Sequence, residues 1–438
     1  MTNSAQPKSS WLAAALVLAI GLSLVAATQP AQAQTLTLLH SFSNGADGSY
    51  PQAGLTMDRA ENLYGTTGSG GLPNHCVSFG CGTVFKLTYK NSGWLLYTIY
   101  SFLGGTDGDG PTSRLVFGPD GALYGTTLYG GQGNCNGDGP NCGIVFRLQP
   151  PAGVCRAFQC PWTETILFRF EGGVYGGIPE GDIIFDPAGN IYGTTAAGGY
   201  TGGNCGSFGC GVVYELSQSN GHWNETVLYA FYGGADGQQP NGGVIRDAAG
   251  NLYGTTTEGG GSSNCGSGCG KVFELSPSQG GWTNNTLYAF QGLNDGALPY
   301  AGLTLDAAGH LYGSTSSYGS GSGGTVFELA PSGGSWVFST IYELSGRFLG
   351  GPQGALTLDG AGNLYGAAQY DGANNVGSVF NLTRMNGSWV YTDIHDFMPQ
   401  GDGGWLFDGL VLDSKGNIYG TAFHGGIHGY GNVFEITP

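Results

Sequence analysis

Charge is scarce in this sequence, and basic residues are the scarcest. Charged residues make up 10% of its 438 residues, and 13 Lys and Arg stand against 30 Asp and Glu, a formal net charge of −17. So few charges exclude a charge-rich disordered chain and a coiled coil. The acidic balance excludes nucleic acid as a partner, because most of the surface would repel a phosphate backbone.

Familiar catalytic motifs are missing as well. The sequence has no Gly-x-Ser-x-Gly elbow, no P-loop and no His-Glu-x-x-His segment. Two carboxylates from different loops could still meet in the fold, so cleavage of a polysaccharide stays open. On balance the sequence favours a binding protein over an enzyme.

Long hydrophobic runs are absent beyond the N-terminus. There, Lys8, an apolar stretch at 11–27 and the small residues of 31–33 form the pattern of a secretory signal peptide. We predict that residues 1–33 are a signal peptide and that 34–438 form a single domain, secreted to the extracellular space or periplasm. We expect a monomer with no transmembrane segment after cleavage.

The ten cysteines fit export to an oxidising compartment. Zinc is the weaker alternative, because zinc knuckles need Cys-x-x-Cys and every spacing here is longer. The five predicted disulfides join Cys76 to Cys81, Cys135 to Cys142, Cys155 to Cys160, Cys205 to Cys210, and Cys265 to Cys269.

Glycine is the one unusually abundant residue, 86 of 438, and it punctuates a sevenfold repeat. A Tyr-Gly pair recurs about every 60 residues, a period typical of propeller blades and other repeat arrays. Each unit holds four strand-like runs, named a to d, which in the first unit are 54–58, 62–67, 82–87 and 94–102. The repeat tyrosines are Tyr64, Tyr124, Tyr192, Tyr253, Tyr312, Tyr365 and Tyr419.

The first and last strands indicate how the units assemble. A surplus d-type run occurs at 35–42, and the last unit stops on its c run at 431–437. These two runs can pair and close a ring, which removes exposed sheet edges. We therefore predict an all-β, seven-bladed β-propeller with four-stranded antiparallel blades, closed by strand 35–42 in the C-terminal blade. An open β-solenoid is the alternative, and it would need capping units.

The repeat motifs resemble those of a known family. Leu-Tyr-Gly-Thr-Thr at 252–256 and Gly-Thr-Val-Phe-Glu-Leu at 324–329 are similar to the GloVer tandem repeat of secreted bacterial proteins. The resemblance covers essentially the whole chain after residue 34. It implies a secreted repeat protein, and the motif is tied to no known activity.

Two recurring residue types are expected to serve the repeat itself. An Asp six residues before most repeat tyrosines can cap the a-to-b hairpin, and a Trp that opens strand d can pack between strands. The Asp residues are Asp58, Asp186, Asp247, Asp306, Asp359 and Asp413, and the Trp residues are Trp94, Trp162, Trp223, Trp282, Trp336 and Trp389.

A second acidic series lies in the d-to-a loops, each Asp followed by Gly. One hypothesis is calcium, which prefers carboxylate and carbonyl oxygens; the other is a turn in which Asp accepts bonds from backbone amides. Blades 3 and 6 lack this Asp, which excludes a full ring of seven calcium sites. The series is Asp47, Asp107, Asp236, Asp295 and Asp402.

The position five residues after each repeat tyrosine varies between units. We expect it to surround or approach the channel mouth on the face of the b-to-c and d-to-a loops, where four of the five disulfides would lie. Rings beside hydroxyls and a carboxylate suit a sugar, and unconstrained drift of a loop position is the alternative. The candidate ligand-binding residues are Ser69, Tyr129, Glu258, Tyr370 and His424. Trp405 is a further candidate, and it occupies the position that directly precedes the loop proline in other units.

Function follows as three hypotheses. The leading one is an exported binding propeller for an extracellular glycan or cell-surface component. The second is a polysaccharide lyase or glycosidase in which Glu258, His424 or His428 supply acid and base; the two His could also share a metal. The third is a structural envelope or matrix protein, which would self-associate.

Overall fold

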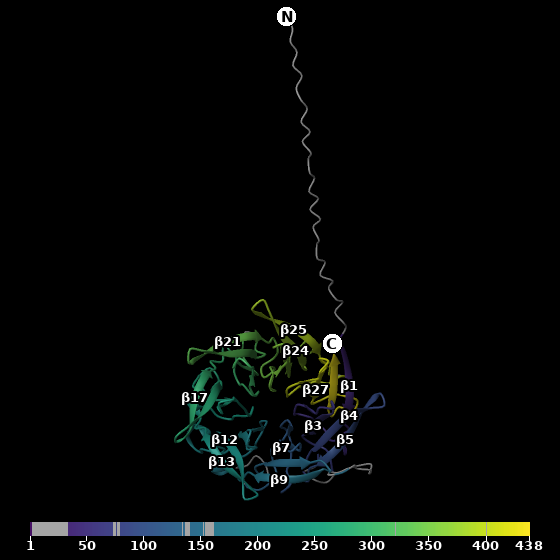
Figure 1. Cartoon of the computed structure of the whole chain (residues 1–438), viewed down its shortest axis with the longest axis vertical. Helices are drawn as coiled ribbons and strands as arrows, with labels where there is room; N and C mark the ends of the chain where they lie inside the picture. The colour runs from purple at the N-terminus through teal and green to yellow at the C-terminus, as the bar shows by residue number, and fades with distance from the viewer. Residues whose placement is uncertain are drawn as a thin grey trace. The chain divides into compact units, whose positions relative to one another are not determined.

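Four strands alternate antiparallel in each of seven sheets, and the sheets stand in a ring (Figure 1). The computed structural model describes residues 34–72, 76, 79–133, 135, 141–151, 153, 162–319, 321–399 and 401–438, together with Met1. Residues 34–438 form one compact unit. The predicted seven-bladed β-propeller is confirmed. The predicted signal peptide lies outside the described residues except for Met1.

The two inner strands of each blade, a and b, are joined by the short turn that recurs in each repeat of the sequence. Each b strand is almost entirely buried, since its two faces contact two neighbouring blades. The a strands are β2 (Thr56–Met57), β6 (Val116–Phe117), β10 (Ile184–Phe185), β14 (Val244–Arg246), β18 (Thr304–Leu305), β22 (Thr357–Leu358) and β26 (Val411–Leu412). The b strands are β3 (Leu63–Thr67), β7 (Leu123–Thr127), β11 (Ile191–Thr195), β15 (Leu252–Thr256), β19 (Leu311–Thr315), β23 (Leu364–Ala368) and β27 (Ile418–Ala422).

The two outer strands are longer and alternate between buried and exposed side chains toward the edge. The c strands are β4 (Thr83–Lys90), β8 (Ile144–Gln149), β12 (Val212–Ser219), β16 (Lys271–Ser278), β20 (Thr325–Ser332), β24 (Ser378–Met385) and β28 (Asn432–Thr437). The d strands are β5 (Gly93–Ser101), β9 (Thr163–Arg169), β13 (His222–Ala230), β17 (Gly281–Ala289), β21 (Ser335–Glu343), β25 (Ser388–Asp396) and β1 (Thr35–Ser41).

Ring closure is as predicted. β1 pairs antiparallel with β28, in a register that sets Thr35 against Thr437 and Leu38 against Phe434. The last sheet is therefore ordered β1-β28-β27-β26 and joins both ends of the compact unit.

The core lies between blades. The ring of Phe85 on β4 packs directly under Gly65 of β3, where an added Cβ would lie 2.5 Å from the ring. This close approach explains why glycine follows the repeat tyrosine. Across the blade boundary, Trp162 contacts Tyr64 at 6.1 Å between ring centroids, and Trp94 contacts Tyr419 at 6.0 Å, so the tryptophans are packing residues as predicted.

The hairpin Asp series also has the predicted capping role. Asp58 accepts hydrogen bonds from the amides of Ala60 and Asn62 and from the hydroxyl of Tyr64. The same pattern recurs in the other blades, for example at Asp413 with Asn417.

Helical structure in the described residues is limited to three short 3-10 turns, η1 (Gly173–Tyr175), η2 (Gly203–Cys205) and η3 (Gly234–Asp236). Within that same part of the chain, no helix has the length and apolar character needed to cross a membrane.

Candidate functional site

The b-to-c and d-to-a loops meet on one face of the ring, as the strand order requires. Short backbone bridges tie them within a blade, joining Ser49 to Ser69 and Gln238 to Glu258. We call this surface the loop face. Every candidate ligand-binding residue predicted from the sequence lies on it.

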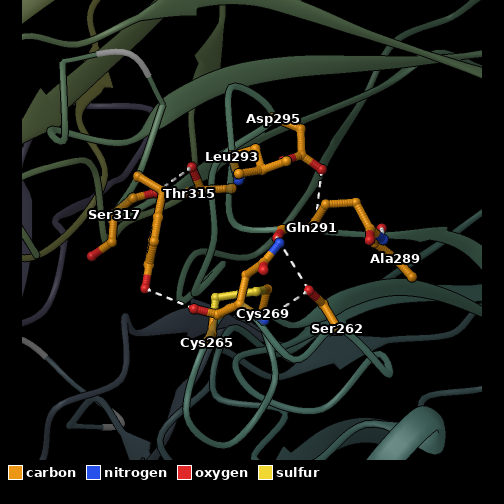
Figure 2. Close-up of a disulfide and its surroundings, with 11 residues drawn as sticks. Ser262, Cys265, Cys269, Ala289, Gln291, Leu293, Asp295, Thr315 and Ser317 are labelled. Carbon is orange, nitrogen blue, oxygen red and sulfur yellow. Dashed lines mark hydrogen bonds between the residues drawn. A yellow bond between two sulfur atoms is a disulfide. The ribbon is translucent and has the colours of Figure 1, made fainter.

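Four disulfides lie on the loop face, each within a single b-to-c loop. The structure contains Cys76–Cys81, Cys135–Cys142, Cys205–Cys210 and Cys265–Cys269, and the predicted Cys155–Cys160 lies outside the described residues. Each bridge seats under a glycine of the following d-to-a loop: an added Cβ on Gly292 would lie 2.6 Å from both Cys265 and Cys269 sulfurs. In Figure 2 this bridge lies beside the turn of Asp295, where Ser262 donates a hydrogen bond to the carbonyl of Gln291 at 3.1 Å. These contacts tie the b-to-c loop to the following d-to-a loop.

The Asp-Gly residues all cap their own turns. Asp295 accepts bonds from the Gln291 amide at 2.8 Å and the Tyr288 hydroxyl at 3.0 Å. In two blades a histidine takes the place of the tyrosine, and His395 contacts Asp402 at 2.8 Å. Burial would raise the pKa of Asp47, but hydrogen bonds from His40 and Ser43 outweigh it and lower the pKa to about 2.

These contacts leave little coordination capacity for calcium. The Asp236 carboxylate lies 3.5 Å from the buried ammonium of Lys271. This ammonium supplies the positive charge that a metal ion would otherwise bring. In the described part of the chain, one group of three His, Cys, Asp or Glu side chains has ligand atoms within 4.8 Å of one another, Cys76, Cys81 and Asp109, and two of these form a disulfide. Calcium binding by the Asp-Gly loops stays a hypothesis.

An aromatic strip crosses blades 6, 7 and 1 on the loop face. Trp405 contacts His424 at 4.3 Å and Tyr370 at 5.7 Å between ring centroids. Tyr50 continues the strip, 4.9 Å from Phe423 and 5.5 Å from His424. We define the aromatic strip as these five residues. Trp405 is half-buried, and its φ of 59° matches that of Tyr50, 56°, in the equivalent position of blade 1.

The strip ends in a cavity of about 510 Å³ between blades 1 and 2, the rim pocket. Its walls share Tyr50 and Phe423 with the aromatic strip and add the predicted residues Ser69 and Tyr129. The fold thus brings five of the six candidate ligand-binding residues into one continuous surface, although they come from four blades.

Glu258 stands apart from this surface, in blade 4. Its carboxylate accepts a hydrogen bond from Gln238 Nε2 at 2.7 Å. Among the described residues no hydrogen bond or ring contact joins Glu258 to His424, and the same holds for His424 and His428. Burial lowers the pKa of His424, which favours the neutral imidazole. The suggested acid–base and metal pairs are therefore not assembled by any described contact.

The axial cavity is lined by other loop positions than the predicted ones. A cavity of about 320 Å³ lies where all seven blades meet, and none of the positions five residues after the repeat tyrosines lines it. The residues that follow the loop proline in six blades, and the one that follows Leu406 in the seventh, line it instead. They lead into strand a, the innermost strand, whereas the predicted positions follow strand b. They are Gln52, Thr112, Glu180, Asn241, Tyr300, Gln353 and Phe407.

Beside this axial cavity lies an ion cluster that the sequence analysis missed. Arg114 Nη2 contacts Asp182 Oδ2 at 3.0 Å, and the Arg114 amide donates to Asp182 Oδ1 at 2.8 Å. Asp408 accepts from the amides of Gly54 and Gly409, and burial with the nearby Asp182 raises its pKa against the effect of Arg114. The sequence does contain a signal for this cluster: its three charged residues occupy positions that hold Gly, Ala or Ser in other units.

The repeats of this chain match the model of a known protein family. The Gloeobacter/Verrucomicrobia repeat matches residues 25–267, 134–336 and 261–438. This chain belongs to the Gloeobacter/Verrucomicrobia repeat family. The match confirms the resemblance drawn from the repeat motifs. Among curated proteins none matches the sequence.

Solved structures similar to this Gloeobacter/Verrucomicrobia repeat protein include two of an ulvan lyase, a polysaccharide lyase. One is 11% identical with a TM-score of 0.51, covering 92% of this chain and 95% of the lyase. The other, bound to a saccharide, is 11% identical with a TM-score of 0.50, covering 90% and 94%. A protein of unknown function from Dyadobacter fermentans is 8% identical with a TM-score of 0.43, covering 92% and 98%. Identities this low show the fold alone.

Proposed function

We propose that this chain is a secreted propeller that binds an extracellular glycan on its loop face. The observation that carries the proposal is the continuity of the aromatic strip with the rim pocket. Sugar rings bind to aromatic faces and to nearby hydroxyl and amide groups, and this surface offers both: Trp405 and Tyr370 at one end, Ser69 and Gln52 at the other.

The rigidity of the loop face supports a binding role. Four disulfides and the backbone bridges hold the loops before any ligand arrives, so little conformational entropy is lost on binding. Disulfides also agree with secretion into an oxidising compartment.

Retention on polysaccharides tests the proposal. We would incubate the purified chain with a panel of soluble and insoluble polysaccharides and compare Trp405→Ala with Tyr89→Ala, a 60% exposed ring outside the loop face. Trp405→Ala should weaken retention about tenfold or more, because stacking aromatics dominate such contacts, whereas Tyr89→Ala should bind as wild type. No retention on any polysaccharide would overturn the proposal, as would equal loss from both variants.

The same incubations separate binding from catalysis and from assembly. Binding without new reducing ends or unsaturated products supports a binding protein. Products that vanish in Glu258→Ala or His424→Ala would establish a polysaccharide-cleaving enzyme. Concentration-dependent self-association without glycan retention would favour a structural protein.

A further inference from the structure

The rim pocket contains a carboxylate at a position that is not acidic in the other blades. Asp109 occupies a loop position that holds Ser49, Gly177, Gln238 or Ala297 in other blades. Its backbone makes the usual bridge to Tyr129, with the amide donating to the Tyr129 carbonyl at 3.0 Å. The bridge needs no side chain, so the fold does not require this carboxylate.

The side chain of Asp109 differs from the other loop-face aspartates in its partners. Asp107, two residues earlier, accepts bonds from the Tyr100 hydroxyl and the Leu103 amide, both at 2.7 Å. Among the described residues no hydrogen bond or ion pair reaches the Asp109 carboxylate, which lies within 4.8 Å of the sulfurs of Cys76 and Cys81. Desolvation raises the pKa of Asp109 to about 6.

The rest of the rim pocket suits a cation that carries hydroxyl groups. Aromatic rings of Tyr50, Phe79 and Tyr129 line it, and a cation is attracted to such faces. Gln52 and Ser69 add groups that bond to hydroxyls. None of the described lining residues is Lys, Arg or His, so none of them could serve as the counter-ion of an acidic saccharide.

Two features of the surroundings favour entry of such a ligand. The formal net charge of −17 attracts cations and repels anions over long range. At the pocket, Phe79 and Leu103 are 62% and 45% exposed, which leaves apolar surface for the carbon face of a sugar ring.

We propose that the rim pocket binds the ammonium group of an amino sugar, with Asp109 as its counter-ion. This inference rests on the proposed glycan-binding function and names the class of glycan. A lysine side chain carries the same charge, but it lacks the hydroxyl groups that Gln52 and Ser69 would bind.

Calorimetry with a matched pair of sugars tests the inference. The probes are oligomers of glucosamine and oligomers of N-acetylglucosamine of equal length, which differ in the charge of the amino group. At about pH 6.5 the Asp109 carboxyl is mostly ionised, and a charge-assisted hydrogen bond should make the glucosamine oligomer bind about tenfold or more tightly.

Two variants separate the pocket from bulk charge. Asp109→Asn keeps the shape of the side chain and should reduce glucosamine affinity to that of N-acetylglucosamine. Glu171→Gln removes the same charge from an exposed d-to-a loop residue outside the rim pocket and should preserve the preference. Unchanged thermal unfolding of both variants confirms that they fold.

The outcomes distinguish this inference from the proposed function. Equal binding of both oligomers, or a preference that survives Asp109→Asn, overturns the inference while glycan binding stands. Tighter binding of polylysine than of the glucosamine oligomer would assign the pocket to a peptide and overturn it as well. Failure of both oligomers and of the whole polysaccharide panel overturns the proposed function and the inference together.

Discussion

The hydroxyl of Thr437 donates a hydrogen bond to the carbonyl oxygen of Thr35 at 3.4 Å, across a sequence separation of 402 residues. Both residues belong to the ladder between β1 and β28, which joins the two ends of the propeller in one sheet. Ring closure therefore depends on a strand of seven residues.

Deleting residues 35–42 should destabilise the whole ring. The deletion exposes the edge of β28 and removes Phe42, which is fully buried and packs 5.3 Å from Phe85. We expect a lower Tm and a broader transition in scanning calorimetry than for a chain that begins at Thr35. An identical Tm for both chains would contradict closure by this strand.

Stability should fall as pH rises from about 5 to about 8, because of Glu225. Both carboxylate oxygens of Glu225 are buried without a hydrogen-bond partner among the described residues, and burial raises its pKa from 4.5 to about 8. In that window the unfolded chain has lost the proton and the folded chain retains it, so rising pH favours unfolding. The pKa of Glu164 at the equivalent site is also raised, by burial and Asp107.

Glu225→Gln tests this pH dependence. The variant should have a flatter Tm-versus-pH curve and gain about 2 °C or more at about pH 8, since it retains a neutral group of the same shape. Glu171→Gln, at an exposed site, should follow the wild-type curve. Parallel curves for wild type and Glu225→Gln would show that Glu225 is not the titrating group.

Removing one disulfide should act locally. A loop this short contributes about 2 kcal/mol by closure entropy, so replacing Cys205 and Cys210 by Ser should lower the Tm slightly and open the b-to-c loop of blade 3 to protease. Glycan retention should survive, because this bridge lies outside the aromatic strip and the rim pocket. Replacing Cys76 and Cys81 should reduce retention, because Cys76 lines the rim pocket. Equal effects of the two replacements would contradict this location of the site.

Calcium removal should change nothing measurable. The Asp-Gly carboxylates already accept bonds from turn amides and from a Tyr or His ring, and Asp236 faces Lys271. We expect the same Tm and glycan retention in EDTA as in excess calcium. A rise in Tm on calcium addition that Asp295→Asn abolishes would establish the calcium hypothesis instead.

The repeat made the fold predictable from the sequence. Seven copies of one pattern repeat the same local preferences, so turns such as that of Asp58 and packing residues such as Trp94 stand out by recurrence. The surplus strand at 35–42 then leaves one way to complete the last blade. Local hydrogen bonding and the alternation of apolar residues are determined within each unit, so they can be predicted from the sequence of that unit.

The site could be predicted only in part, because recurrence says nothing about neighbours across blades. Sequence variation marked Ser69, Tyr129 and Trp405, but their union into one surface depends on the order of blades around the ring. Arg114 and Asp182 lie 68 residues apart and meet only because strand a lines the axis. From the sequence, Asp109 cannot be distinguished from the aspartates that cap turns. Only the tertiary structure shows that its carboxylate has no described partner. Sequence determined the blade, and packing between blades determined which exceptional residues face one another.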